Sequence, residues 1–347
     1  MTERTAQANQ VKMKGQRPID RHRTAAGSAV VGTPDEGAIT SMVEIDGALY
    51  IIKQRAIYAL QSADQIDPER TNADLPRFLH QHIRSVGSES EVVGRTLLTA
   101  VNLFHKGKFL PKWFAHERAL LLTLDALENM VAMRAAADEF EVAQQDALVA
   151  AQTSTRGRSS MQIPRMGDIK TRLRTFAQRA DHAANALFGI VELFYKDFGR
   201  GGWKNLVNAV RSRYGSDDSF TDFLGRAVPF LMLVRNARDC LEHNLKGASV
   251  KDFVLQPDGQ IVAPTIEINF RQTHQSPIAI SSFMGEILNM TMVVFEIMIA
   301  HLCDKHVQSP TPDLPILVGA LQENRRREKF VRFSYGTYLG EDFVPIG

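Results

Sequence analysis

The residues best suited to chemistry lie in one stretch, LMLVRNARDCLEHNLKG, at positions 231–247. Arg238 is followed five positions later by His243. Arginine carries a planar guanidinium that can bind two phosphate oxygens, and histidine titrates near neutral pH and can transfer a proton. RNA can be cleaved without a metal when its 2′-hydroxyl attacks the adjacent phosphate, and this reaction needs those two functions. Arg238 and His243 are therefore candidate catalytic residues.

Three polar neighbours could assist them. Asp239 and Asn244 could orient the imidazole ring or the ribose. Arg235, one helical turn before Arg238, could bind a neighbouring phosphate. We therefore count Asp239 among the catalytic candidates, and Arg235 and Asn244 among the substrate-binding ones. If the helix ends at His243, its dipole favours the protonated ring, which suits a general acid.

A long amphipathic helix must position these residues. Apolar residues recur three and four positions apart, and Arg238 lies five full turns after Phe220, on the same face. A guanidinium on a core-facing stripe must be paired or must line a cavity. A purely structural role is the alternative, because Arg238 could form an ion pair with Glu242, four positions later, and His243 could cap the helix.

The motif resembles that of the HEPN superfamily, in which an arginine followed by a small polar residue is separated from a histidine by four to six positions. Here these residues are Arg238, Asp239 and His243. The resemblance covers roughly residues 111–306. It implies an all-helical fold, usually dimeric, with the motifs of two protomers brought together, and in many members a metal-independent endoribonuclease of toxin or anti-phage systems. Some relatives carry a tyrosine two positions after the histidine, which a partner nucleotidyltransferase modifies, and this chain departs from them with Leu245.

The pattern of apolar residues divides the chain into four parts. Residues 1–37 are polar and basic without an apolar stripe, and we expect them to form a disordered tail. Residues 38–110 show helical spacing and are expected to form an N-terminal helical subdomain. We expect a HEPN-like helical bundle over 111–306 with a small β-hairpin at about 251–270, and a C-terminal extension over 307–347. The predicted fold class is therefore mainly α.

The composition is that of a soluble globular protein. The chain has 347 residues, of which 44% are hydrophobic and 23% charged, and its formal net charge of +2 indicates no particular partner. Cys240 and Cys303 are too few for a disulfide framework and indicate a reducing compartment. No apolar run resembles a signal peptide, and the most apolar segment, 287–302, contains Asn289 and Glu296. We therefore expect a cytoplasmic protein without a membrane segment.

We expect neither a cofactor nor a metal. The sequence has no glycine-rich phosphate loop, no His-Glu-x-x-His and no Gly-x-Ser-x-Gly motif, and its histidines at 80, 82 and 105 lack partner ligands at suitable spacing. The prediction is an endoribonuclease of HEPN type, a toxin or anti-phage effector that acts on RNA as a homodimer, with an antitoxin or defence-system protein as candidate partner. The alternatives are a HEPN-like scaffold that binds RNA or a partner without cutting it, and an unrelated helical interaction protein.

Overall fold

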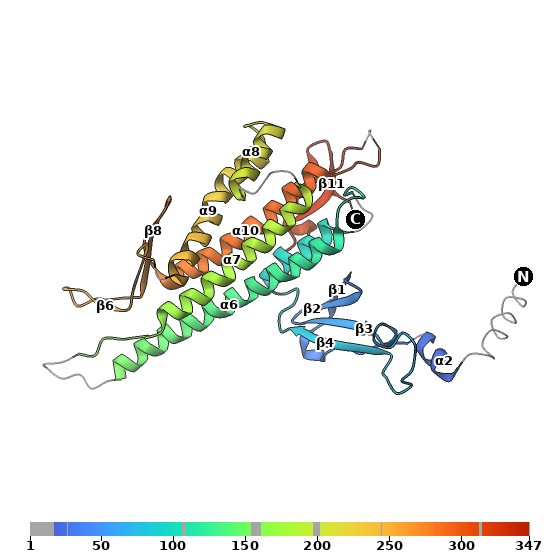
Figure 1. Ribbon diagram of the computed structural model, residues 1–347, viewed down its shortest axis with the longest axis horizontal. Coiled ribbons are helices and arrows are strands. Elements are labelled where there is room, and N and C mark those ends of the chain that lie inside the picture. Colours follow the sequence, from blue (N-terminus) through green and yellow to red (C-terminus); the bar gives the residue numbers. More distant parts are fainter. Residues whose placement is uncertain are drawn as a thin grey trace, which may run out of the picture. The chain divides into compact units, whose positions relative to one another are not determined.

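The chain forms two compact units, Met1–Val93 and Gly94–Gly347, drawn in Figure 1. The boundary between them precedes the expected boundary after residue 110. The computed structural model describes residues 17–25, 27–105, 109–153, 161–196, 202–243, 245–311 and 314–346.

The expected mainly α fold is wrong. About 50% of the chain is helical and about 20% is strand. Over the described residues the strands form four sheets of two to four strands each. A helical bundle with one hairpin and a helical N-terminal elaboration therefore does not describe this protein.

The first unit contains an antiparallel sheet where a helical subdomain was expected. Its strands follow one another in the order β1-β2-β3-β4. The strands are β1 (Ile39–Ile45), β2 (Ala48–Lys53), β3 (Ile57–Ser62) and β4 (Phe78–Arg84). The short helices are α2 (Pro18–Thr24), the 3-10 helix η1 (Pro34–Glu36), α3 (Ala63–Ile66) and α4 (Glu91–Val93). Thus the described part of the expected tail, 1–37, contains helix, and its residues 1–16 and 26 lie outside the described part.

The turn between β1 and β2 explains why helical spacing was misleading. Asp46 and Gly47 both have positive φ angles, 50° and 73°, and Ile45 pairs directly with Ala48. Two positive φ angles are what a two-residue hairpin turn requires, and Asp-Gly is one of its preferred sequences. The apolar residues before and after this turn belong to two strands, although their spacing also fits one helix.

A buried lysine organises the start of the first unit. Lys53 is 5% exposed, and its Nζ lies 3.0 Å from Oε2 of Glu36. The hydroxyl of Tyr58 donates a hydrogen bond to the other oxygen of Glu36 at 2.6 Å. That hydrogen bond is the main reason why the pKa of Glu36 is lowered to about 2. The segment before β1 is therefore fixed to β2 and β3 by charge as well as by apolar packing.

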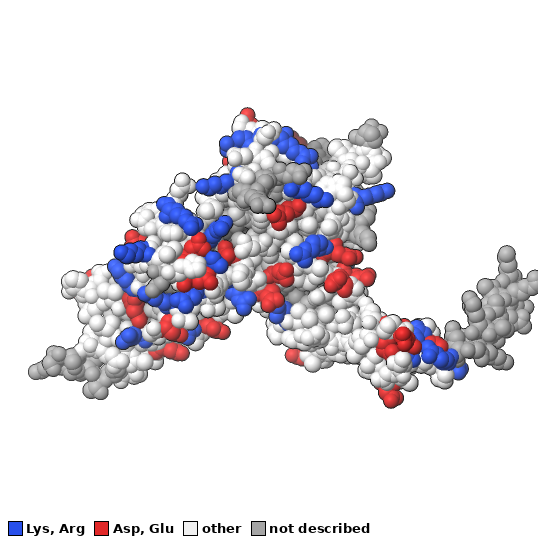
Figure 2. Space-filling model, viewed as in Figure 1, with Lys and Arg blue, Asp and Glu red and all other residues white. Residues whose placement is uncertain are grey.

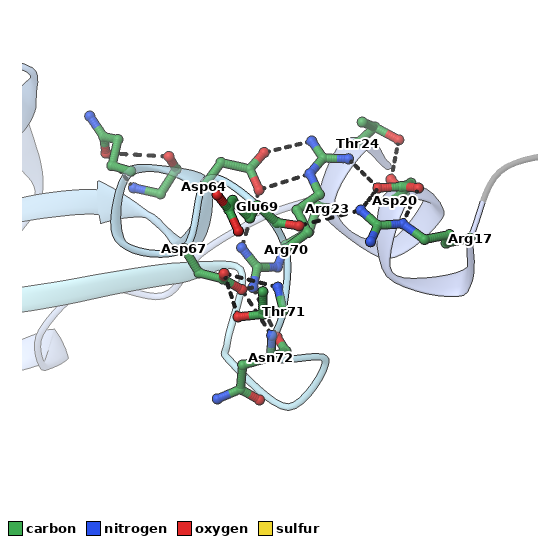
Figure 3. A network of polar contacts seen from close by, with 12 residues as sticks. Arg17, Asp20, Arg23, Thr24, Asp64, Asp67, Glu69, Arg70, Thr71 and Asn72 are labelled. Carbon is green, nitrogen blue, oxygen red and sulfur yellow. Dashed lines mark hydrogen bonds and ion pairs between the residues drawn. The ribbon is translucent and has the colours of Figure 1, made fainter.

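A second polar network fixes α2 to the connection between β3 and β4 (Figure 3). The guanidinium of Arg23, whose side chain is 1% exposed, lies 3.1 Å from Asp64 and 3.3 Å from Asp67. Arg70 lies 2.7 Å from Asp64 and 3.1 Å from Asp20 of α2. Ion pairs between two arginines and three carboxylates thus attach α2 to the segment that connects β3 and β4.

The second unit is built on long helices. Figure 1 shows α6 and α7 lying side by side as a helical hairpin, with α9 and α10 along them. A π-helix, Gly94–Leu98, precedes the first α-helix of the unit. The α-helices are α5 (Thr99–Leu103), α6 (His116–Thr153), α7 (Ile169–Phe194), α8 (Trp203–Tyr214), α9 (Ser219–Glu242) and α10 (Ile280–His306).

Three small sheets complete the second unit. The turn expected near Asp258 does join a pair of strands, but the expected hairpin is only part of the β-structure after α9. The strands there are β5 (Ala248–Lys251), β6 (Val254–Leu255), β7 (Ile261–Val262), β8 (Thr265–Phe270) and β9 (Thr273–Ala279). The C-terminal extension adds β10 (Leu317–Ala320), a 3-10 helix (Glu323–Arg325), β11 (Phe333–Leu339) and β12 (Asp342–Pro345).

Buried polar contacts hold the C-terminal sheet against the helices. Glu296 of α10 is fully buried and binds Arg95 of the π-helix at 2.5 Å and Arg332 just before β11. The hydroxyl of Tyr335 donates to the backbone oxygen of Leu103 at 2.7 Å. The C-terminal extension is therefore part of the same core.

α10 is the one described helix long and apolar enough to cross a membrane by length and composition. In its most apolar 18-residue window, 67% of the residues are buried inside the protein. A helix enclosed by its own protein in this way fits the core of a soluble protein.

Candidate functional site

The motif lies at the end of α9, as the apolar pattern predicts. The side chain of Asp218 caps the start of this helix by accepting a hydrogen bond from the backbone N–H of Phe220 at 3.0 Å. The helix continues through Pro229, and His243 is its C-cap residue. Since α9 packs against α7, one side of the motif faces a neighbouring helix.

Arg238 is half-buried and surrounded by carboxylates. Its Nη1 donates to Oδ1 of Asp239 at 3.0 Å. Its Nε lies 2.6 Å from Oε2 of Glu242 and 3.9 Å from Oδ2 of Asp181 on α7. Arg238 is therefore paired, which is one of the two arrangements expected for a guanidinium on this stripe.

The ion pair with Glu242 is the contact that a structural role predicts. Both side chains are about 30% exposed, at 31% for Arg238 and 30% for Glu242. The 2.6 Å contact lacks hydrogen-bond geometry, so Oε2 has no hydrogen-bond donor. The other oxygen accepts a bond from Nε2 of Gln178 on α7, at 3.5 Å. Glu242 therefore links α9 to α7 and also occupies one edge of the guanidinium.

Asp181 is the buried acid of the site. The residue is 8% exposed, and burial raises the pKa of its carboxyl, while the positive charges of Arg238 and Arg235 act in the opposite direction. Asn185 donates a hydrogen bond to it at 3.2 Å. The hydrogen bond to Asp239 raises the pKa of Arg238, so the guanidinium stays charged.

His243 is exposed to solvent. Its backbone N–H donates to the backbone oxygen of Asp239 at 3.1 Å, which closes the last turn of α9. No hydrogen bond from its ring to any other described residue is present, so the ring does not form the helix cap that the structural alternative allowed. Arg235 is also exposed. Asn244, the second predicted substrate-binding residue, lies outside the described part of the chain.

Two residues that sequence reasoning missed complete the network. Arg271, in the turn between β8 and β9, places its Nη1 3.3 Å from Oδ2 of Asp239 and 3.3 Å from Oδ1 of Asn236. The amide of Asn236, which is 2% exposed, donates to Oγ1 of Thr273 at 2.7 Å. Asp239 therefore lies between two arginines, Arg238 and Arg271, and joins the helix end to the hairpin turn.

A cavity of about 700 Å³ adjoins this network, with Asn236 and Arg271 in its wall. Among the described residues, no group of three or more His, Cys, Asp or Glu side chains could hold a metal ion. The chemistry that the described groups can perform is therefore that of a charged guanidinium, an exposed imidazole and three carboxylates.

Comparison of the chain with models of protein families, with curated proteins and with solved structures finds no match.

Proposed function

We propose that this protein is a metal-independent endoribonuclease in which Arg238 binds the scissile phosphate and His243 transfers a proton. The proposal rests on one observation. The end of α9 holds a permanently charged guanidinium in a fixed position, and the next turn presents an exposed histidine whose ring forms no hydrogen bond with the described residues. The resemblance of this motif to that of the HEPN superfamily supports the same reading.

The guanidinium retains hydrogen-bonding capacity for a phosphate. Arginine has five N–H donors. Contacts with carboxylates engage Nε and one N–H of Nη1 of Arg238, and no described residue binds its Nη2. A phosphate approaching the exposed edge could therefore take two parallel hydrogen bonds, which is the geometry that arginine offers best.

His243 then provides the proton. The 2′-hydroxyl of the ribose attacks the adjacent phosphorus, the bond from phosphorus to the 5′ oxygen breaks, and the imidazolium donates its proton to that leaving oxygen. The products are a 2′,3′-cyclic phosphate and a free 5′-hydroxyl. Asp239 assists by fixing Arg238 at 3.0 Å.

We infer that the active form is a homodimer in the cytoplasm. The reaction also needs a base that removes the 2′ proton. The described residues near His243 include no second histidine at bonding distance, so a second copy of the motif would supply this base.

Basic and acidic side chains are interspersed on the face shown in Figure 2. Attraction of RNA would therefore depend on local contacts and fall with rising salt. A role as a toxin or anti-phage effector with a partner that restrains it follows from the resemblance.

A second candidate function is a scaffold that binds RNA or a partner without cutting. The favouring observation is the ion pair between Arg238 and Glu242, because it makes the arginine part of the joint between α9 and α7. In this case the motif would stabilise a helix end, and cleavage would be absent from the wild-type protein.

Cleavage of RNA in the presence of a chelator separates these functions. We expect His243→Ala to lower the cleavage rate by about a hundredfold to ten-thousandfold, the usual cost of losing a proton-transfer group, and to change RNA affinity little. Arg238→Ala should lower both. Arg226→Ala is the matched control, because Arg226 also lies on α9 and pairs with an acid four residues away, at 2.7 Å. Absence of cleavage by the wild type, or unfolding of the His243→Ala variant, would contradict the proposal.

A further inference from the structure

A cavity lies between α9, the first turn of α8, the turn that joins β8 to β9 and the start of β9. Its volume is about 700 Å³, which is within the range of small-molecule sites. The α9 side is apolar and is formed by Val228, Phe230, Met232 and Leu233. Only Val228 is buried, so the other three side chains keep part of their apolar surface open to a ligand.

The opposite side of the cavity is basic and polar. Lys204 comes from α8, Arg271 comes from the β8–β9 turn, and Thr273 and His274 are the first two residues of β9. Neither Asp nor Glu is among the described residues that line it. A ligand with a flat apolar part and a negative group would therefore match both walls.

The wall also contains a buried amide with unused hydrogen-bonding capacity. Asn236 is 2% exposed. One N–H of its amide is used by Thr273 and one lone pair of its oxygen by Arg271. An asparagine amide has two N–H groups and two lone pairs, so one donor and one acceptor are left. Such a pair can read the edge of a nucleobase.

The cavity is connected to the proposed catalytic motif through one carboxylate. Arg271 binds Asp239, and Asp239 accepts the hydrogen bond from Arg238. The backbone of Arg271 has a φ of 56°, a conformation that non-glycine residues rarely adopt and that persists where surrounding contacts hold it. The turn therefore keeps a cation between the cavity and the motif.

We propose that this cavity binds the base of the nucleotide next to the scissile phosphate and so gives the enzyme a base preference. The inference rests on the proposed ribonuclease function. Phe230 and its apolar neighbours contact the face of the base, and Asn236 contacts its edge. Arg271 and Lys204 bind the phosphate of the same nucleotide.

Binding of the four nucleoside monophosphates to the full-length chain tests the site without requiring catalysis. We expect at least one of them to bind with a Kd of roughly 1 mM or tighter. Met232→Trp should fill the cavity and weaken that binding by about tenfold or more. Met290→Trp is the matched control, because Met290 is 40% exposed on α10 and does not line the cavity. It should leave binding within about twofold.

Mapping of cut sites in a random RNA pool gives the second measurement. The wild type should prefer the base whose monophosphate binds most tightly, and Met232→Trp should cut with a weaker preference. Cleavage without base preference and without monophosphate binding would overturn the inference and leave the ribonuclease proposal standing. Monophosphate binding that Met232→Trp weakens, with no cleavage by the wild type, would support the site and contradict the ribonuclease. Binding of an alkyl carboxylate such as decanoate in place of every nucleotide would also overturn it.

Discussion

Asp181 of α7 lies 3.9 Å from Nε of Arg238 on α9 and is 8% exposed. Among the described residues, it is the acid that approaches Arg238 from another helix. Burial raises the pKa of its carboxyl, and the nearby arginines lower it. The pKa is above the usual 3.8, so the effect of burial is the larger one. The pairing of α7 with α9 at the motif thus carries an electrostatic cost at neutral pH.

The first prediction follows from the sign of that shift. The folded protein binds a proton at Asp181 more readily than the unfolded chain does, so this carboxyl destabilises the fold increasingly as the pH rises above 3.8. Asp181→Asn should therefore gain stability relative to wild type between pH 4 and pH 7, measured by urea unfolding. Asp222→Asn, an exposed acid of α9, serves as the control. A variant that loses stability relative to wild type over the same range would disprove this account.

Helices of the second unit were predictable where one apolar stripe is buried, as in α7 and α9. α9 ends at Glu242, one residue before the motif histidine, as expected for the helix that carries the motif. The prediction failed where the pattern was ambiguous. Residues 38–62 have apolar spacing that fits a helix, but the Asp46-Gly47 turn divides them into strands.

The candidate site was predictable only along its own helix. Glu242 could be placed beside Arg238 because residues four positions apart on a helix are neighbours. Asp239 was expected to orient the imidazole or the ribose, and its bond to Arg238 was not foreseen. Asp181 and Arg271 come from other elements, and no periodicity specifies which side chain crosses from one element to another. An acid between Ala180 and Ala183 on an apolar stripe was the available signal for Asp181.

The second prediction concerns the first unit. The hydrogen bond from Tyr58 is the largest cause of the lowered pKa of Glu36, which is about 2. A lowered carboxyl pKa stabilises the fold fully above the usual value of 4.5, and this contribution is lost as the pH falls towards 2. Tyr58→Phe should raise the pKa of Glu36 towards 4.5 and make the stability of the unit less dependent on pH in that window.

The pKa of Glu36 can be read directly from a carbon-13 NMR titration of its side chain. Tyr50→Phe is the matched control, since Tyr50 lies in the adjacent strand β2 and forms no hydrogen bond to Glu36. The account is wrong if Tyr58→Phe leaves the Glu36 titration unchanged.

The third prediction concerns the attachment of α2. Arg23→Ala removes a guanidinium whose side chain is 1% exposed and that binds Asp64, Asp67 and the backbone oxygen of Asn72. Breaking a buried pair usually costs about 3–5 kcal/mol, and the partial exposure of the two acids reduces this to about 2 kcal/mol here. Arg17→Ala, at an arginine whose side chain is 59% exposed, should cost much less, because solvent screens an exposed ion pair. Equal losses for the two variants in urea unfolding would mean that burial of Arg23 contributes nothing.

The last prediction tests whether Glu242 restrains the motif. Oε2 of Glu242 occupies the Nε edge of Arg238 at 2.6 Å without hydrogen-bond geometry, so a phosphate that binds this edge must displace it. Glu242→Gln removes the competing charge and keeps the shape of the side chain. We expect RNA to bind more tightly by roughly three- to tenfold at low salt, because each removed acid strengthens the local attraction for phosphate.

The gain in affinity from Glu242→Gln should shrink as salt is raised, because screening weakens the lost repulsion. Asp222→Asn is the matched control, since Asp222 pairs with Arg226 on the same helix at the same four-residue spacing, and it should change RNA affinity by less than about twofold. If Glu242 acts only as a joint between α9 and α7, Glu242→Gln will instead lower the melting temperature and leave RNA affinity unchanged. That outcome would support a structural role for Arg238 in the joint between α9 and α7.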